Sequence, residues 1–258
     1  MTRARGSAGP SDPLGGPAAD PPGVPGLPEA DGAGHARAPR RIIVGMTGAS
    51  GAIYGIRLLE ALRDEPIEVH LVMSEWARKT IVLETDYRAA TVAKLADVVY
   101  PEDDMSAPVG SGSFLAAGMI VAPCSMKSLA AIANGLSGNL VHRAADCALK
   151  EQRKLVLLVR EAPLSIIHLE NMLRVARAGA VVSPPVPAFY ARPRSLDEMV
   201  DHTIGRLLDH FDIERGMVRR WDGRRPRGDQ AAGDAERAER VDRADREDRA
   251  DRAEDAGG

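Results

Sequence analysis

Side chains able to bind anions and move protons stand directly after several short apolar runs of this 258-residue chain. They supply hydroxyls, cations, one carboxylate and one phenol: Ser50, Ser74, Ser125, Ser128, Lys127, Arg160, Glu161 and Tyr190. Hydroxyls at helix starts, together with Lys and Arg, form a binding site for an anion such as a phosphate. A positioned carboxylate can transfer a proton. No cluster of His, Cys or carboxylates has metal-ligand spacing, so a phosphate or nucleotide site is predicted without a metal.

The segment from Arg41 to Gly55 carries the strongest local signal. An apolar run, Ile42 to Met46, passes into small residues at 47–51, and a helical pattern follows at once. The N–H groups of such a loop and the positive end of the next helix attract anions, and glycine allows close approach of a ligand. The loop lacks the spacing of dinucleotide binders and the Lys of a P-loop, so another phosphate or nucleotide ligand is expected. A bare strand-to-helix turn is the alternative.

Other polar residues admit two interpretations each. Ser125 precedes a helical pattern, so it serves equally well as a helix N-cap or as a ligand hydroxyl. Arg160 and Glu161 end the most apolar run, where burial of an ion pair would be costly without a use. We therefore expect Glu161 to shuttle a proton and Arg160 to neutralise a phosphate. His142 and His168 lie inside helical patterns and are predicted to be surface or packing residues, and so are Cys124 and Cys147.

Strand-like and helix-like segments alternate through the middle of the chain. Buried strands are predicted at 42–46, 68–73, 118–122, 154–159 and 180–183, the third ending at Pro123. Helices are predicted after residue 51, from Ser74 through Leu83, and at 125–132, 140–150, 165–178 and 196–211. This alternation predicts an α/β fold whose parallel sheet is covered by helices on both faces. Residues that follow the strands should then line one crevice.

The composition divides the chain into three parts. Residues 1–39 are rich in Pro and Gly and are predicted to be a disordered tail. Residues 40–222 suffice for one domain, and 223–258 form a charged Arg/Asp/Glu/Ala tail, either disordered or a solvated helix. The net charge of -3 gives no reason to expect nucleic acid, and no run is long enough to span a membrane. Two cysteines without a C-x-x-C pair favour a reducing compartment, the cytoplasm.

Six segments together resemble the UbiX-type flavin prenyltransferases, and the resemblance runs from about Arg41 to about Ile213. They are Thr47-Gly-Ala-Ser-Gly-Ala-Ile-Tyr-Gly55, Pro123-Cys-Ser-Met-Lys-Ser-Leu-Ala130, Arg143-Ala-Ala-Asp146, Leu149-Lys-Glu151, Arg160-Glu-Ala-Pro-Leu164 and Pro184-Pro-Val-Pro-Ala-Phe-Tyr190. The resemblance implies a three-layer, flavodoxin-like or Rossmann-like α/β subunit that works without metal. It also implies joining the five-carbon unit of dimethylallyl phosphate to N5 and C6 of reduced FMN, in a dodecamer with sites at subunit contacts. The prenylated FMN would pass to a UbiD-type decarboxylase.

The resemblance also assigns roles to individual residues. It implies FMN contacts at Gly48, Ala49, Ser50, Ser74, Ser125, Met126, Lys127, Ser128 and Arg160. Dimethylallyl phosphate would meet Tyr190 and Arg206, with Lys150 close by. Glu161 matches the proton-transfer carboxylate and Glu84 a second acidic site residue, so Glu161, Ser50, Lys150 and Glu84 are the candidate catalytic residues. Trp221 matches a C-terminal Trp that helps close the site in some members.

Two other functions remain as alternatives. An FMN-dependent decarboxylase of the cysteine-decarboxylase type would share the first loop. Such proteins resemble this chain less around Pro123-Cys-Ser-Met-Lys127, and they use a His near the second helix, whereas no His lies between His70 and His142 here. A non-catalytic flavin-carrying subunit of an aromatic acid decarboxylase would need FMN contacts only. The presence of Glu161, Lys150, Tyr190 and Arg206 argues against it.

Overall fold

A six-stranded parallel sheet forms the centre of the part of the chain that the computed structural model describes, residues 40–221 and 223. The strands are β1 (Arg40–Met46), β2 (Ile67–Met73), β3 (Val98–Tyr100), β4 (Gly118–Cys124), β5 (Lys154–Val159) and β6 (Val181–Val182). Their order is β3-β2-β1-β4-β5-β6, and every neighbouring pair is parallel. The predicted parallel α/β fold is therefore confirmed. The two predicted tails lie outside the described residues, Gly223 excepted.

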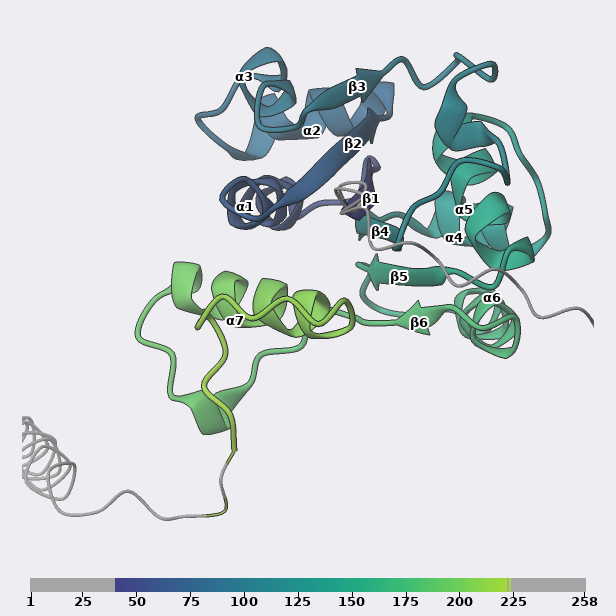
Figure 1. Cartoon of the computed structure of the whole chain (residues 1–258). Coiled ribbons are helices and arrows are strands. Elements are labelled where there is room, and N and C mark those ends of the chain that lie inside the picture. Colours follow the sequence, from purple (N-terminus) through teal and green to yellow (C-terminus); the bar gives the residue numbers. More distant parts are fainter. Residues whose placement is uncertain (1–39, 222, 224–258) are drawn as a thin grey trace, which may run out of the picture. The chain divides into compact units, whose positions relative to one another are not determined.

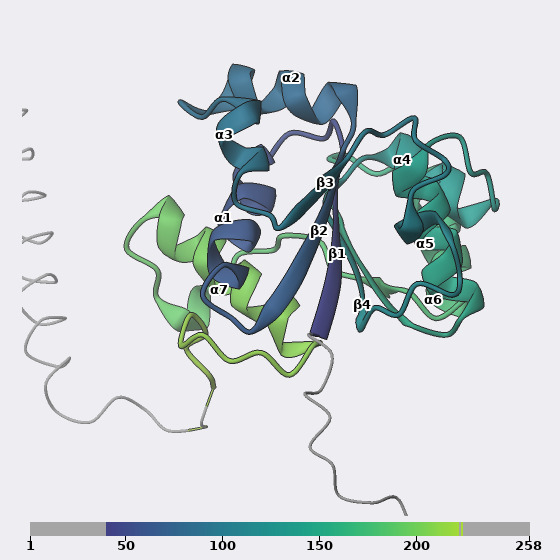
Figure 2. The ribbon, with the colours of Figure 1, turned by 45° about the horizontal axis from the view of Figure 1, so that its top comes forward.

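Helices cover both faces of this sheet and make three layers (Figures 1 and 2). They are α1 (Ala52–Leu62), α2 (Glu75–Glu84), α3 (Ala89–Ala93), α4 (Met126–Ala133), α5 (Leu140–Lys150), α6 (Ile166–Arg177) and α7 (Leu196–Asp209), with short 3₁₀ turns η1 (Pro108–Gly110) and η2 (Phe189–Ala191). In Figure 2, α1, α3 and α7 lie on one side of the strands and α4, α5 and α6 on the other. The sheet is thus buried on both faces, as its continuous apolar strands require.

Alternate side chains of each strand enter two separate hydrophobic cores. Ile42, Val44 and Met46 of β1 pack with buried residues of α1 and α7, whereas Ile43 packs with residues of β4 and α5. This alternation follows from the two-residue period of a strand. The packing of the strands in these two cores fixes the positions of the strand ends and therefore of the residues that directly follow them.

The structure differs from the sequence prediction at two strands. The strand predicted to end before Pro123 continues to Cys124, and its pairing with β5 shifts register between Val121 and Cys124. Since proline lacks an N–H, a local irregularity of this kind lets it remain within a sheet. The edge strand β3 was not predicted, because three residues, of which the middle one, Val99, is exposed, are too few to give a readable pattern. The helix α3, only five residues long, was also missed.

Polar side chains cap the N-termini of α2, α4 and α5, whereas Gly51 before α1 makes no side-chain cap. The side chains of Ser74, Ser125 and Asn139 accept hydrogen bonds from N–H groups in the first turns of α2, α4 and α5. The predicted cap role of Ser125 is thus confirmed. Since β1 has β2 on one side and β4 on the other, the strand order reverses there, and a crevice is expected at the carboxyl ends of β1 and β4.

Candidate functional site

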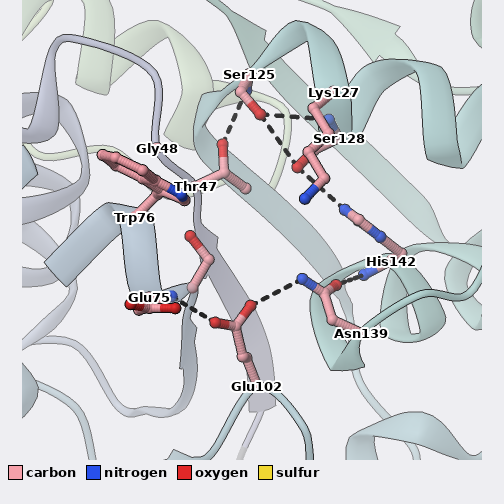
Figure 3. Close-up of a pocket in the computed structure, with 11 residues that line it drawn as sticks. Thr47, Gly48, Glu75, Trp76, Glu102, Ser125, Lys127, Ser128, Asn139 and His142 are labelled. Atoms are coloured by element: carbon pink, nitrogen blue, oxygen red, sulfur yellow. Dashed lines mark hydrogen bonds between the residues drawn. The ribbon is translucent and has the colours of Figure 1, made fainter. Parts of the chain in front are cut away.

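A cavity of about 330 Å³ lies at the carboxyl ends of the strands, where the strand order reverses (Figure 3). Its walls come from residues that follow β1, β2, β3 and β4 and from the first turns of α2, α4 and α5. The lining residues are Thr47, Gly48, Ser74, Glu75, Trp76, Glu102, Ser125, Lys127, Ser128, Asn139 and His142. The volume falls in the range typical of small-molecule sites. Hydroxyls and helix N-termini facing one cavity suit a ligand with phosphate or carbonyl oxygens.

Thr47 ties the ends of β1 and β4 together beneath this cavity. Its hydroxyl donates to the carbonyl oxygen of Pro123 at 2.8 Å and accepts from the Ser125 N–H at 2.8 Å. Its backbone N–H also donates to the Pro123 carbonyl oxygen, at 3.2 Å. Thr47 is only 3% exposed, so these bonds are shielded from water. The first turn of α4 is thereby fixed relative to the first βα loop.

A chain of three polar side chains runs along one wall. Ser125 Oγ accepts from the Ser128 N–H and donates to Ser128 Oγ, the latter over 3.2 Å. Ser128 Oγ in turn lies 3.1 Å from Nε2 of His142, whose ring is buried. Burial lowers the pKa of His142, and the charge of nearby Lys127 lowers it further, against a smaller opposing effect of Glu102. This wall therefore holds hydroxyls and a neutral imidazole.

Glu102 joins two helix N-termini at the opposite wall (Figure 3). One carboxylate oxygen accepts from the Glu75 N–H of α2 at 2.5 Å, and the other accepts from Asn139 Nδ2 at 2.9 Å. The Glu102 carbonyl oxygen accepts from the Leu140 N–H of α5 at 2.7 Å. Glu102 thus determines the spacing between α2 and α5 across the cavity.

The glycine loop after β1 is not an open anion site in this structure. A Cβ on Gly48 would lie 2.4 Å from Cβ of Trp76, so it is the packing of α2 that requires glycine there, whatever binds. At the start of α1, the N–H groups of Gly51 and Ala52 donate to the carboxylate of Glu84 at 2.7 and 3.1 Å. The protein's own carboxylate therefore fills the position that the sequence suggested for a ligand anion.

This carboxylate is held ionised by its surroundings. Partial burial would raise the pKa of Glu84, but hydrogen bonds from Ser50, Gly51 and Ala52, together with the charge of Arg160, outweigh it and lower the pKa. A carboxyl group with a lowered pKa is a poor proton donor. Its geometry fits a residue that fixes the Ser50 loop.

Most residues predicted to contact FMN lie at the cavity. Gly48, Ser74, Ser125, Lys127 and Ser128 line it. Ala49 is buried within the first loop, and Met126 packs on the hydrophobic core beneath α4. Neither side chain is among the lining residues. Ser50 faces Glu84 instead, at the start of α1.

Arg160 and Glu161 are both exposed in the subunit, so the expectation that they form a buried pair is wrong for the single chain. They follow β5, whose end is open because the next strand, β6, has only two residues. Arg160 affects the pKa of Glu84 and of Tyr54, which places its charge near the start of α1. Glu161 accepts a hydrogen bond only from a neighbour in the chain, the Ala162 N–H at 3.0 Å, among the interactions that the structure describes.

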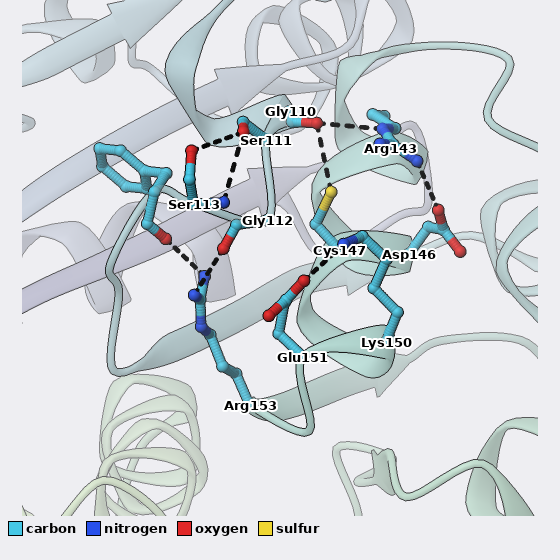
Figure 4. A network of polar contacts seen from close by, with 11 residues as sticks. Gly110, Ser111, Gly112, Ser113, Arg143, Asp146, Cys147, Lys150, Glu151 and Arg153 are labelled. Atoms are coloured by element: carbon cyan, nitrogen blue, oxygen red, sulfur yellow. Dashed lines mark hydrogen bonds and ion pairs between the residues drawn. The ribbon is translucent and has the colours of Figure 1, made fainter.

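Lys150 is not among the residues that line the cavity and belongs instead to a separate network of polar contacts (Figure 4). It ends α5, two turns beyond His142, and pairs with Glu151 at 2.5 Å. Two helical turns correspond to about 11 Å along the axis. The neighbouring Arg153 donates to the carbonyl oxygens of Gly112 and Phe114, which anchors the loop after η1 beside this pair.

Tyr190, in the 3₁₀ turn η2, and Arg206, on α7, belong to a third group. The Tyr190 hydroxyl lies 3.3 Å from Nε2 of His202, and its ring meets that of Trp221 edge-on at 6.0 Å. Arg206, one turn beyond His202, pairs with Asp209 at 2.7 Å. Trp221 therefore contacts Tyr190, and its role in closing the site stays a prediction. None of these residues lines the cavity within one subunit.

Several lining residues were not assigned a role from the sequence. Thr47 and Glu75 stand in the segments predicted to border the crevice, but Trp76, Glu102, Asn139 and His142 gave no sign of it. Glu102 follows β3, the strand that was missed. His142 is buried, as a packing residue would be, yet its ring also faces the serines of α4. His168, in contrast, completes the capping box of α6 with Ser165.

Cys124 and Cys147 are free and buried, in line with their predicted packing role, and burial raises the pKa of Cys124 to about 12. Within residues 40–221 and 223, no group of three or more His, Cys, Asp or Glu side chains is placed to hold a metal ion. The same residues contain no helix long and apolar enough to cross a membrane.

Comparison with known proteins extends these findings. The model of the Flavoprotein family matches residues 33–214. The chain is 55% identical over 183 residues to the "Probable UbiX-like flavin prenyltransferase" of Bacillus subtilis (strain 168), which covers 71% of this chain and 90% of that protein. It also resembles the crystal structure of AnUbiX (PadA1) in complex with FMN and dimethylallyl pyrophosphate, with 57% identity, a TM-score of 0.71, and coverage of 72% of this chain and 99% of that one. A dodecameric FMN-dependent Ubix-like decarboxylase from Escherichia coli O157:H7 matches with 55% identity, a TM-score of 0.70, and coverage of 70% and 99%.

Proposed function

Since the chain belongs to the Flavoprotein family and, within it, to the UbiX-like flavin prenyltransferases, we propose that it transfers a dimethylallyl group to reduced FMN. The product is FMN prenylated at N5 and C6, made for a UbiD-type decarboxylase. The single observation that carries this proposal is the cavity at the ends of β1 and β4, lined by hydroxyls and helix N-termini. A flavin nucleotide offers phosphate and carbonyl oxygens to such donors.

The residues of the cavity fit FMN as the acceptor. Ser74, Ser125 and Ser128 offer hydroxyls, and Lys127 adds a positive charge at the exposed rim. Gly48, Ala49 and Ser50 form the loop beside it, while Met126 shapes the start of α4. We assign Arg160 to the FMN site as well, because its charge lies near the Ser50 loop. The flavin supplies the nucleophilic nitrogen and carbon, and these residues bind and orient it.

The residues assigned to the prenyl donor lie on other surfaces of the subunit. Tyr190, Arg206 and Lys150 do not line the cavity of their own chain, so we propose that a homo-oligomer, a dodecamer, brings them to it. The exposed apolar face of α6 supports assembly, since Ile166, Ile167 and Leu173 are 72%, 64% and 51% exposed. Exposed apolar surface of this kind marks interaction sites. The match to a dodecameric structure supports the same arrangement.

The chemistry demands two things of these side chains. The departing phosphate must be stabilised as its bond to carbon breaks, which suits the cations Arg206 and Lys150. A proton must leave the flavin nitrogen and another must reach the phosphate, which suits the exposed carboxylate of Glu161. Glu84, whose pKa is lowered, holds Ser50 in place. Closure of the site by neighbouring subunits would keep water from the allylic carbon.

The donor is proposed to be dimethylallyl phosphate; the AnUbiX structure contains the pyrophosphate. A cytoplasmic location is proposed as well, on the basis of the two free cysteines. The comparisons favour neither alternative function, although two of the solved relatives, at 55% and 45% identity, carry the name of a decarboxylase.

Anaerobic mixing of the full-length protein with reduced FMN and dimethylallyl phosphate tests the proposal. Mass spectrometry of the extracted flavin should show the mass of one added five-carbon unit, and parallel samples with the pyrophosphate should identify the donor. Unchanged flavin with both donors would contradict the proposed reaction. A peptide ending in cysteine, added instead of a donor, should remain intact.

A further inference from the structure

A buried histidine lies behind the cavity hydroxyls and makes contact with one of them. His142 of α5 and Ser128 of α4 are each 5% exposed, and His142 Nε2 lies 3.1 Å from Ser128 Oγ (Figure 3). The other ring nitrogen, Nδ1, is buried without a hydrogen-bond partner among the described residues. The ring therefore has one polar contact, and that contact is a residue of the cavity wall.

The hydrogen bonds around Ser128 determine what its hydroxyl can offer. A serine hydroxyl has one hydrogen to donate and two lone pairs that accept. Ser125 Oγ donates to one lone pair of Ser128 Oγ over 3.2 Å. If His142 Nε2 carries the ring hydrogen, this N–H donates to the second lone pair of Ser128 Oγ, and the hydroxyl hydrogen of Ser128 is free to point into the cavity. If Nδ1 carries it, Ser128 must donate to the ring instead, and a buried N–H is left unpaired.

The second arrangement is the more costly one. A buried N–H without an acceptor loses its hydrogen bond to water and gains nothing in return. A ring with both nitrogens protonated is also disfavoured, because burial and the charge of Lys127 lower the pKa of His142. The neutral ring with its hydrogen on Nε2 therefore fits the geometry best, and the bond made by one nitrogen fixes the tautomer.

We infer that His142 is a positioning residue whose Nε2–H donates to Ser128 and so turns the Ser128 hydroxyl toward an acceptor oxygen of the bound flavin nucleotide. The inference rests on the proposed function, because the acceptor is taken to belong to FMN. It makes Ser128 an obligatory hydrogen-bond donor, and the cavity wall selective for phosphate or carbonyl oxygens over ligand N–H groups.

FMN titrations of matched variants test this role without any turnover. His142→Phe keeps a flat ring but removes the donor, and it should raise the FMN dissociation constant about tenfold, whereas His142→Gln, whose amide N–H can replace the donor, should stay within about threefold. In a Ser128→Ala background, His142→Phe should cause no further loss. His210→Phe, at the end of α7 and outside the cavity, is the control. Equal losses in both backgrounds, or no loss in either, would overturn the inference.

The tautomer can be observed directly in the FMN-free protein, even if a variant fails to fold. Solid-state nitrogen NMR of the full chain with isotopically labelled histidine, assigned by difference from His142→Gln, should show Nε2 protonated and Nδ1 bare. A hydrogen on Nδ1 alone would refute the inference while leaving the proposed function untouched. Failure of the wild-type protein to bind FMN would instead count against the proposed function.

Discussion

The cavity and the groups around it are built in opposite ways. At the cavity, hydrogen bonds of Thr47, Ser125 and Ser128 join the ends of β1 and β4 to the start of α4, and Thr47 and Ser128 are buried. Glu161, Lys150 and Arg206 are exposed, and the hydrogen bonds and ion pairs that the described part of the chain gives them are with Ala162, Glu151 and Asp209. This difference supports the proposal that one subunit binds the flavin, while neighbouring subunits bring the donor-binding and proton-transfer residues to it.

The substitution Glu161→Gln should have the largest effect, because it should separate FMN binding from prenylation. Because Glu161 makes no contact with the cavity wall, its loss should leave FMN binding unchanged, yet prenylation should stop since no proton can be moved. Single-turnover assays with reduced FMN and dimethylallyl phosphate measure the second effect and fluorescence titration the first. Glu170→Gln, an exposed change on α6, serves as the control. Normal product formation by the Glu161 variant would remove this residue from the mechanism.

Arg206→Ala should weaken binding of the prenyl donor much more than binding of FMN. Loss of a charge that stabilises the departing phosphate costs about 2.7–4 kcal/mol in comparable anion sites, or roughly a hundredfold to a thousandfold in rate. Donor binding and turnover should therefore fall steeply while FMN affinity holds, because Arg206 is absent from the cavity lining. Arg177→Ala, near the end of α6, is the matched control. Parallel losses of both ligands would show that the two regions are not separate.

Thr47→Val should affect both stability and the cavity. The change preserves shape but leaves the Ser125 N–H without its partner, at a cost of about 1–3 kcal/mol in free energy of unfolding. FMN affinity should fall as well, since α4 loses its anchor. Urea unfolding measures the first effect. The same change at Thr203, whose hydroxyl bonds only within α7, should cost far less. A stable Thr47 variant with full FMN affinity would mean that the hydroxyl does not organise the wall.

Loss of the hydrogen bonds between the Glu84 carboxylate and the start of α1 should have a smaller, pH-dependent effect on the free energy of unfolding. Because its pKa is lowered from 4.5 in the folded chain, its contribution to stability is present above about 4.5 and is lost as the pH falls through the lower folded value. Glu84→Gln should flatten this acid dependence and loosen the Ser50 loop. Unfolding curves at neutral and acidic pH, compared with Glu170→Gln, measure it. An unchanged pH profile would show that Glu84 does not fix the loop.

Deletion of residues 1–38 should have the smallest effect. This Pro- and Gly-rich segment is proposed to contribute nothing to the domain, because it has too few large apolar side chains to build a core. The shortened protein should keep its turnover and its melting temperature. A variant that folds normally but turns over slowly would assign a role to the segment.

The sequence was most informative where local patterns, such as apolar runs and capping residues, determine the structure. Val and Leu runs such as 154–159 revealed the central strands, and Ser125 was recognised both as a cap and as a crevice residue. It failed where long-range packing decides. The residues around Gly48 in the sequence do not show that a side chain there would collide with Trp76. Likewise, the residues around Glu84 do not show that its carboxylate binds the N–H groups at the start of α1. The exposure of Arg160 and Glu161 depends on the shortness of β6, and the role of Glu102 on a strand of three residues.

A crystal structure of the protein with bound FMN would show whether neighbouring subunits complete the cavity. The nucleotide should lie in the cavity between Thr47 and Asn139, with an oxygen atom about 3 Å from Ser128 Oγ. Lys150 and Tyr190 of neighbouring subunits should also face the flavin. FMN bound elsewhere, or a flavin in the cavity that no other subunit approaches, would contradict this arrangement.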